Sequence, residues 1–274
     1  MIQTTLKYCI IGYPLEFSLS PIIHHYWYQK YNINSFYTKN RISPNILEEF
    51  IYSIKENKDY NGFNITMPFK EKIKQYCKNL SIEASESEAV NTVKIINSEL
   101  FGYNTDCFAF NHLLNEYSQT YNKVLILGAG GYSKSVINVL LKNPSNVIHV
   151  INRNIEKAVL LKKFYNNKLE IIENFSAESY DLIINATPIN NINYLKLVED
   201  VRASNKNTLF IDAAYTNNLT PLEKACKDLG RNIINGKTLL IYQAAKAFEI
   251  WFDFFPAIDQ ALFSKINLEI NKTH

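Results

Sequence analysis

The stretch Lys123–Leu127 (KVLIL), followed at once by GAGGYS over residues 128–133, decides the fold that this sequence predicts. A short apolar run is typical of a strand that is buried on both faces of a parallel sheet. After the glycines, Val136, Val139 and Leu140 recur at helical spacing, which predicts a helix. We therefore expect a strand, a tight glycine turn and a helix, in that order.

The glycines of this turn are suited to the pyrophosphate of a dinucleotide. Gly128 permits a tight turn, and Gly130 lacks a Cβ, so a pyrophosphate can approach the helix N-terminus, where free N–H groups favour an anion. The third position of the G-x-G-x-x-G fingerprint holds Ser133, which is small but not glycine. Between a strand and a helix such a match predicts a nucleotide site, and a glycine turn without a ligand is the less favoured interpretation.

The residues after the next strand bear on which dinucleotide would bind. A site for NAD usually carries an acidic residue about 20 positions after the glycines, at the end of the second strand. Here the run Val147–Ile151 leads into Asn152-Arg153, with no carboxylate, and Lys157 follows one turn later. A guanidinium and an ammonium group suit a 2′-phosphate, which a carboxylate would repel. We therefore predict NADP as the cofactor, although Arg153 taken alone could be a solvated surface arginine.

Apolar runs and amphipathic stretches alternate along the chain, which predicts an α/β fold. In the N-terminal part, Ser20 is expected to cap a helix ahead of Pro21. Further helices are predicted over Ile46–Lys55, Pro68–Cys77 and Ile82–Glu88. Strands are predicted at Leu6–Ile11, Ser35–Ile42, Gly62–Thr66, Thr92–Ile96 and Leu100–Tyr103, the last returning antiparallel after a turn.

From Lys123 onward the alternation of strands and helices predicts a parallel, doubly wound, Rossmann-like sheet. Its strands are expected at Val124–Leu127, Val147–Ile151, Leu169–Ile172, Leu182–Asn185 and Leu209–Asp212, with helices such as Ile155–Tyr165 and Pro221–Leu229 between them. We therefore expect three parts: an α/β substrate-binding catalytic domain over 1–106, a dinucleotide-binding domain over 107–236, and a helical segment over 237–274 that packs back on the first domain.

Composition excludes several classes of protein. The 274 residues are 47% hydrophobic and 20% charged, with a formal net charge of +3, which is typical of a soluble globular chain and too weakly basic for nucleic-acid binding. No apolar run approaches the roughly 18 to 20 residues of a membrane span, and the N-terminus lacks the pattern of a secretory signal. Four scattered cysteines are typical of reduced thiols. We expect a cytoplasmic protein with no metal, membrane or nucleic-acid partner; the oligomeric state stays open, a homodimer included.

A series of short motifs runs from residue 10 to residue 251 in a specific order around the glycine loop. They are Gly12-Tyr13-Pro14, Ser18-Leu19-Ser20-Pro21, Asn64-Ile65-Thr66-Met67-Pro68-Phe69-Lys70, Ala89-Val90-Asn91-Thr92, Gly102-Tyr103-Asn104-Thr105-Asp106, Asn152-Arg153, Asn185-Ala186-Thr187-Pro188, Asp212 with Tyr215, and Gln243-Ala244-Ala245. No one of them is distinctive alone. In this order and spacing, the chain resembles the shikimate dehydrogenase family.

The resemblance implies an oxidoreductase that reversibly reduces 3-dehydroshikimate to shikimate with NADPH, in the shikimate pathway to chorismate and the aromatic amino acids. It implies Lys70 and Asp106 as the catalytic pair. An ammonium group beside the carbonyl oxygen stabilises the developing negative charge and can donate a proton, and a carboxylate holds the amine in place. Which of the two transfers the proton stays open. Without the family, Lys70 would be an ordinary exposed helix lysine and Asp106 a helix N-cap.

The resemblance also implies which residues bind the two small molecules. Ser18 and Ser20 would bond the substrate carboxylate, with Tyr215 as a further contact. The residues expected to recognise its hydroxyl groups are Asn64, Thr66, Asn91 and Gln243. Those expected to bind the cofactor are Gly128, Ala129, Gly130, Gly131, Ser133, Asn152, Arg153, Lys157, Thr187 and Gly236. A site of this kind rejects analogues that lack a hydroxyl, because its buried polar groups would be left unpaired.

The chain departs from the family pattern at four places. Phe17 stands where histidine is common, Glu88 where glycine is usual, Asn217 where proline is frequent, and Thr238-Leu239 in place of a Gly-Met pair. None of these removes a catalytic group. Two alternatives remain: a quinate/shikimate dehydrogenase that prefers NAD, and a non-catalytic binding paralogue that kept the fold. The lack of an acidic strand end disfavours the first, and the retained catalytic pair and glycine loop disfavour the second.

Overall fold

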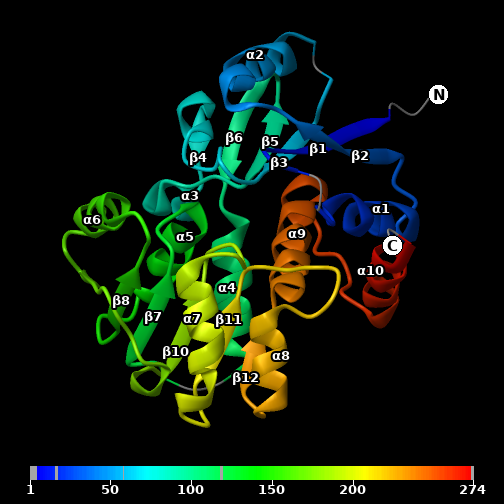
Figure 1. The fold of residues 1–274 in the computed structure, drawn as a ribbon. Helices are drawn as coiled ribbons and strands as arrows, with labels where there is room; N and C mark the ends of the chain where they lie inside the picture. The colour runs from blue at the N-terminus through cyan, green and yellow to red at the C-terminus, as the bar shows by residue number, and fades with distance from the viewer. Residues whose placement is uncertain (1–4, 16–17, 58, 118–119, 273–274) are drawn as a thin grey trace. The chain divides into compact units, whose positions relative to one another are not determined.

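The structure is a computed structural model that describes residues 5–15, 18–57, 59–117 and 120–272 (Figure 1). It divides into two compact units. One, which we name the discontinuous unit, is Met1–Ala109 with Leu240–His274, and the other, the central unit, is Phe110–Leu239. The boundaries fall inside two helices, α4 (Thr105–Asn115) and α9 (Gly236–Phe252). Phe17 lies outside the described residues.

The discontinuous unit is built on a mixed six-stranded sheet in the order β2-β1-β3-β5-β6-β4. β1 pairs in parallel with β2 and β3, whereas β5 is antiparallel to both β3 and β6. The predicted antiparallel return is thus confirmed, with Asn97 and Ser98 at positive φ in its turn. The strands are β1 (Leu6–Gly12), β2 (Ser35–Arg41), β3 (Gly62–Ile65), β4 (Asn79–Leu80), β5 (Thr92–Ile96) and β6 (Glu99–Tyr103).

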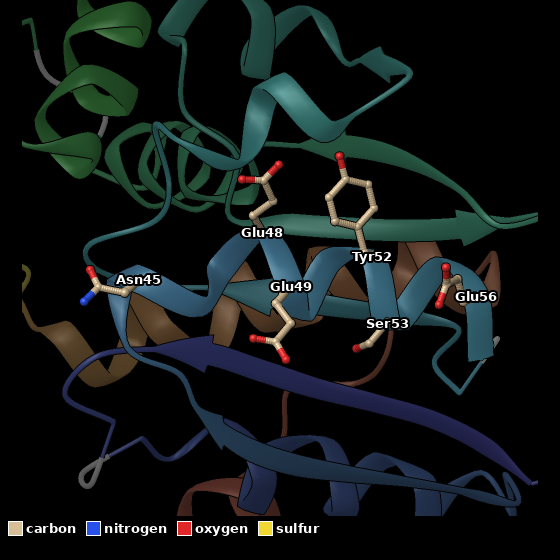
Figure 2. Close-up of a pocket in the computed structure, with 6 residues that line it drawn as sticks. All are labelled: Asn45, Glu48, Glu49, Tyr52, Ser53 and Glu56. Carbon is tan, nitrogen blue, oxygen red and sulfur yellow. The ribbon is translucent and has the colours of Figure 1, made fainter.

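Helices α1 (Ser20–Lys30), α2 (Leu47–Asn57), α3 (Ile82–Ser87) and α10 (Gln260–Lys272) belong to the same unit. α2 follows a 3₁₀ turn and buries Leu47, Ile51 and Ile54, one helical stripe, in a core that also contains Phe63 of β3. Figure 2 shows α2 and the turn before it, where six side chains that line a surface pocket are drawn. They are Asn45, Glu48, Glu49, Tyr52, Ser53 and Glu56.

The structure corrects the prediction that Ser20 caps α1. The N-cap is Leu19, which has no side-chain group for capping, and Ser20 is the first helical residue, with Pro21 in the first turn. The Ser20 N–H lies 3.4 Å from Ser18 Oγ. Ser20 is 2% exposed, and within the described ranges its hydroxyl bonds to nothing. The hydroxyl is therefore not used in capping the helix.

The helix predicted over Pro68–Cys77 is wrong, because only Ile73–Tyr76 form a short 3₁₀ turn. The reason is a competing hydrogen bond. In an α-helix the carbonyl of Lys70 would accept from the N–H four residues later, but here it accepts from the N–H of Val90 at 2.8 Å. This bond ties the segment that carries Lys70 to the residues just ahead of β5.

Helix α9 packs on the sheet of the discontinuous unit through Trp251. The Trp251 Nε1–H donates to the carbonyl oxygen of Val93 at 3.0 Å, and its ring centroid lies 4.5 Å from that of Tyr8 on β1. A Cβ at Gly62 would lie 2.5 Å from Trp251 Nε1, closer than any real side chain allows. Glycine is therefore required in β3 so that the helix can approach.

The central unit holds six parallel strands in the order β12-β11-β10-β7-β8-β9, which confirms the predicted doubly wound sheet. The chain leaves β7 in one direction and β10 in the other, and in such sheets ligands bind outside the carboxyl ends of the strands at this reversal. The strands are β7 (Lys123–Leu127), β8 (Val147–Ile151), β9 (Leu169–Ile171), β10 (Leu182–Asn185), β11 (Leu209–Asp212) and β12 (Asn232–Ile234). The helices are α5 (Gly131–Leu140), α6 (Ile155–Phe164), α7 (Ile192–Asp200) and α8 (Pro221–Asp228).

This unit has a core of its own, in which Leu125, Ile183 and Phe210 of three adjacent strands meet Tyr194 and Leu222. In the part of the chain that the structure describes, none of the helices has both the length and the apolar character needed to cross a membrane.

Candidate functional site

Lys70 and Asp106 form an ion pair in the discontinuous unit, with Nζ 2.6 Å from Oδ2. Their side chains are 18% and 8% exposed, so the pair is largely shielded from water. The Oδ1 atom of Asn104 lies 3.2 and 3.4 Å from the N–H groups of Asp106 and Cys107 and caps α4. Asp106 is therefore not the N-cap, and Lys70 is not an exposed helix lysine. Of the three Nζ protons, two have no acceptor among the residues described.

Asn91 and Gln243 are joined by a hydrogen-bond network that includes Thr105. Asn91 Oδ1 accepts from the Thr105 N–H at 2.8 Å, and Asn91 Nδ2 donates to Gln243 Oε1 at 3.4 Å. Gln243 Nε2 donates to the carbonyl of Leu240 at 2.9 Å. Each amide carries two protons, so Asn91 and Gln243 each retain one N–H that no described residue accepts. Thr105 directly precedes Asp106, so this network adjoins the ion pair.

Asn64 is held more completely. The Tyr37 hydroxyl donates to Asn64 Oδ1 at 2.7 Å, and Asn64 Nδ2 donates to Thr92 Oγ1 at 3.0 Å and to the carbonyl of Asn91 at 3.3 Å. Both amide protons of Asn64 are therefore used, and one lone pair of Oδ1 is left to accept a further hydrogen bond. Sequence reasoning missed Tyr37 and Thr105 as members of this network. Thr105 could have been found beside Asp106, but nothing in the sequence marks a tyrosine of an edge strand.

The other predicted substrate residues lie apart from this network or outside the unit. Ser18 precedes α1 and Ser20 begins it; both are buried, and neither hydroxyl bonds to the network within the described ranges. Thr66 follows β3, and a Cβ at Gly12 would lie 2.3 Å from its Cγ2, so glycine is required beside it. Tyr215 follows β11 in the central unit and is described with that unit.

The glycine loop of the central unit has the predicted geometry, with Gly130 as the N-cap of α5. Gly128 has a φ of +115°, and a Cβ there would lie 2.9 Å from the carbonyl oxygen of Ala186, so only glycine fits. Ala129 lies half-buried between the two glycines. At Gly130 an added Cβ would meet nothing within 4 Å, so the space in front of the helix is open to an approaching anion. Ser133 is fully buried, and its hydroxyl has no partner among the described residues.

The segment after β8 presents two cationic side chains. Asn154 caps α6 by accepting from the N–H of Lys157 at 3.0 Å, and Asn152 Nδ2 donates to the carbonyl of Asn154 at 2.7 Å. These bonds fix the backbone around Arg153. The side chains of Arg153 and Lys157 are exposed and bond to no described residue, so both are available to an anion at the carboxyl end of a strand that neighbours β7.

Thr187 and Gly236 belong to the turns at the same end of the sheet. Thr187 follows β10, and its hydroxyl donates to Asn185 Oδ1 at 2.6 Å. A Cβ at Gly128 would lie 3.1 Å from Thr187 Cγ2, so the structure brings these two predicted residues together at the reversal of strand order. At Gly236 a Cβ would lie 2.3 Å from the carbonyl oxygen of Ala214, which follows β11.

Two of the departures from the family pattern, Glu88 and Thr238-Leu239, can be described from their local contacts. Glu88 is the C-cap of α3 with a φ of +48°, a left-handed conformation in which glycine is usual. The carboxylate of Glu88, which a glycine would lack, forms an ion pair with Lys74 Nζ at 2.7 Å. Thr238 lies in the first turn of α9, where its N–H and hydroxyl bond to Asn235 Oδ1 at 2.9 and 3.1 Å, and Leu239 is buried.

Comparison with known proteins agrees with this geometry. Residues 10–93 match the family model for the shikimate dehydrogenase substrate binding domain, and residues 112–230 match the model for shikimate / quinate 5-dehydrogenase. A shikimate dehydrogenase (NADP(+)) of Pelagibacter ubique is 39% identical over 261 residues, which cover 92% of this chain and 95% of that protein.

Solved structures have the same fold. The crystal structure of shikimate dehydrogenase from Aquifex aeolicus has a TM-score of 0.82 and 29% identity, covering 97% of this chain and 99% of that one. A shikimate dehydrogenase in complex with NADP⁺ has a TM-score of 0.82 and 30% identity, covering 98% of this chain and 96% of that one. The chain therefore belongs to the shikimate dehydrogenase family.

Proposed function

We propose that this protein is an NADP-dependent oxidoreductase that reversibly reduces 3-dehydroshikimate to shikimate, a step toward chorismate and the aromatic amino acids. One observation carries the proposal: the shielded ion pair in which Lys70 Nζ lies 2.6 Å from Asp106 Oδ2. A non-catalytic paralogue would have no need to keep this pair. The name of the Pelagibacter ubique relative supports both the substrate and the cofactor.

Lys70 is the group proposed to meet the reacting oxygen. Reduction of a ketone places negative charge on its oxygen, and an ammonium group within hydrogen-bonding distance stabilises that charge and can donate a proton. One Nζ proton bonds to Asp106, which leaves two for the substrate oxygen. Asp106 holds the amine in place, and the Asn104 cap holds the backbone of Asp106 in turn.

The unused hydrogen-bonding groups support the proposed substrate contacts. Asn91 and Gln243 each have one free N–H to donate to a hydroxyl oxygen, and Asn64 has one lone pair to accept from a hydroxyl proton. The hydroxyl of Thr66 is also proposed to bind a hydroxyl group of the substrate. The hydroxyls of Ser18 and Ser20, with Tyr215, are proposed to bind the carboxylate. Ser20 supports this role because its hydroxyl is not used in capping α1.

Two features of the glycine loop in the central unit fit a dinucleotide. The space in front of Gly130 is open, and the backbone of Ala186 comes close to Gly128. When bound there, NADPH supplies the hydride that reduces the carbonyl carbon. We propose that the loop 128–131 with Ser133 holds the pyrophosphate and that Thr187 and Gly236 shape the turns beside it. The free side chains of Arg153 and Lys157, next to Asn152, are proposed to bind the 2′-phosphate.

The decisive experiment measures steady-state rates with NADPH and NADH, each combined with 3-dehydroshikimate and 3-dehydroquinate. We expect the highest kcat/KM with NADPH and 3-dehydroshikimate. Higher values with NADH would contradict the cofactor, and higher values with 3-dehydroquinate would contradict the substrate. NADPH binding without turnover would support the non-catalytic paralogue instead. Arg153→Ala should raise KM for NADPH and leave KM for NADH unchanged, with the exposed Arg202→Ala as its control.

Two further properties are proposed with the function. The four cysteines are free thiols, which supports a location in the reducing cytoplasm. A homodimer stays a prediction, and size-exclusion chromatography with light scattering would decide between it and a monomer.

A further inference from the structure

The carboxylate of Asp212, at the end of β11, is fully buried and accepts four hydrogen bonds. Oδ1 accepts from Asn185 Nδ2 at 2.8 Å and from the Ala214 N–H at 3.1 Å. Oδ2 accepts from Thr220 Oγ1 at 2.8 Å and from the Tyr194 hydroxyl at 3.2 Å. Two carboxylate oxygens offer about four acceptor positions, so Asp212 has no capacity left for a ligand.

The two hydroxyl groups tie the carboxylate to the start of α8. Thr220 Oγ1 accepts from the Glu223 N–H, and the Tyr194 oxygen accepts from the Leu222 N–H, both at 3.1 Å. Since each hydroxyl already accepts from a backbone N–H, its own proton is directed at Asp212. The N-terminal N–H groups of α8 are thus linked to the carboxylate through one hydroxyl each, which anchors Asp212 in place.

On its other side Asp212 orients Asn185, whose amide is also saturated. Asn185 Nδ2 donates to Asp212 and to the carbonyl of Thr187 at 2.9 Å, and its Oδ1 accepts from the Thr187 N–H at 3.0 Å and the Thr187 hydroxyl at 2.6 Å. This arrangement closes the turn Asn185–Thr187 on itself. The carbonyl of Ala186, inside the turn, is the atom nearest to the position of a Cβ at Gly128.

We propose that Asp212 is a positioning residue for the dinucleotide loop: by orienting Asn185 it fixes the turn Asn185–Thr187 against Gly128. The inference rests on the proposed function, because it assumes that this edge of the central unit binds NADPH. Without the carboxylate, the Asn185 amide can rotate and the turn loses its fixed shape. We then expect weaker cofactor binding and an unchanged chemical step, because all four hydrogen-bond partners of Asp212 belong to the central unit.

The test compares Asp212→Ala with a matched disruption of the same carboxylate, Thr220→Val, which removes a donor on the side away from Asn185. We expect Asp212→Ala to raise the Kd for NADPH about tenfold, as losing one or two ordering hydrogen bonds would, with kcat at saturating NADPH nearly unchanged. Thr220→Val should lower Tm and leave Kd within about twofold. Equal increases of Kd in both variants would overturn the proposal, because they would reflect general destabilisation.

A double-mutant cycle tests whether Asp212 acts through Asn185. If it does, Asp212→Ala should raise Kd no further in an Asn185→Ala background; additive effects would contradict the proposal. Asp212→Asn keeps an acceptor for Asn185 and should restore the parent Kd. If Asp212→Ala does not fold, Asn185→Ala alone decides, and an unchanged Kd would overturn the inference.

Amide hydrogen exchange separates this inference from the proposed function. The Thr187 N–H should exchange faster in Asp212→Ala than in the parent, and at the parent rate in Thr220→Val, without any cofactor present. A parent protein that does not bind NADPH would refute the proposed function, whereas the exchange of Thr187 would still decide the role of Asp212. Unchanged exchange in Asp212→Ala would refute the positioning role.

Discussion

Two polar clusters of this protein, one in each unit, differ in how completely their hydrogen-bonding groups are used. In the discontinuous unit, Lys70, Asn91 and Gln243 keep donors that no described residue accepts. In the central unit, Asp212 and Asn185 have every donor and acceptor position filled. When a polar group is shielded from water and has an unused donor or acceptor, a ligand that hydrogen-bonds to it is stabilised. A group whose hydrogen-bonding positions are all filled can only hold its neighbours in place. The difference is the one expected between a proposed binding site and the residues that support one.

The sharpest test of this comparison is Lys70→Ala, because it removes both the unused donors and the proposed proton donor. We expect kcat to fall about a thousandfold, within the range for general acid–base groups, while NADPH binding is retained. Lys72→Ala is the control, since the Lys72 side chain is exposed and bonds to no described residue. A loss similar to that of the control would show that the ion pair is structural.

Gln243→Met should weaken substrate binding by removing one donor with little change of shape. We expect KM for 3-dehydroshikimate to rise about tenfold, as the loss of one hydrogen bond from a half-buried side chain would give, with KM for NADPH unchanged. The exposed Gln75→Met serves as the control. Equal increases of both KM values would mean that Gln243 supports the fold and not the substrate.

His24 is a third case, a buried polar side chain whose two ring nitrogens have no hydrogen-bond partner among the described residues. It stacks on Tyr37 at 4.4 Å between centroids, and burial lowers its pKa to about 3. Between its usual pKa of 6.5 and about 3 the unfolded chain binds a proton that the folded chain does not. The free energy of unfolding should therefore fall as pH falls below 6.5, by about 1.4 kcal/mol per pH unit.

Urea unfolding across this pH range measures the effect. His24→Phe keeps the ring stacking and removes the titration, so its stability should vary less with pH than that of the parent. His112→Gln, at an exposed position, should keep the slope of the parent. Identical slopes for the parent and His24→Phe would show that other groups cause the acid sensitivity.

The smallest effect is expected within α5, where two buried serines differ in their partners. The Ser133 hydroxyl has none among the described residues, whereas the Ser135 hydroxyl donates to the carbonyl of Gly131 at 3.1 Å. Ser133→Ala should raise the free energy of unfolding by about 1 kcal/mol, and Ser135→Ala should lower it by about the same amount. If the free energy of unfolding changed in the same direction in both variants, the different hydrogen bonding assigned to Ser133 and Ser135 would be wrong.

The sheet of the central unit could be predicted from the sequence because its signals are local. Val147–Ile151, Leu182–Asn185 and Leu209–Asp212 are apolar runs with the bounds that the structure gives to β8, β10 and β11. The glycine loop was also predictable, since Gly128 and Gly130 are set by the turn and the helix start beside them. The strands β4 and β12 were missed because two or three residues carry too weak a pattern.

Features that depend on distant residues could not be predicted. The helix expected over Pro68–Cys77 is absent because Val90, twenty residues after Lys70, takes its carbonyl. The partners of Asp212 are spread from Asn185 to Thr220, so the sequence cannot show that all acceptor positions of this carboxylate are filled. For the same reason the proposed catalytic pair could be predicted only from the family resemblance, since Lys70 and Asp106 lie 36 positions apart.

The contact between Gly62 and Trp251 has a consequence for the order in which the protein is made. The strands around Gly62 are translated before the central unit, whereas Trp251, whose indole lies beside Gly62, is translated after it. The central unit is one continuous segment, and domains made in one piece can fold during synthesis. The sheet around Gly62 is translated before the central unit, but it is therefore expected to complete its core only after that unit has been made.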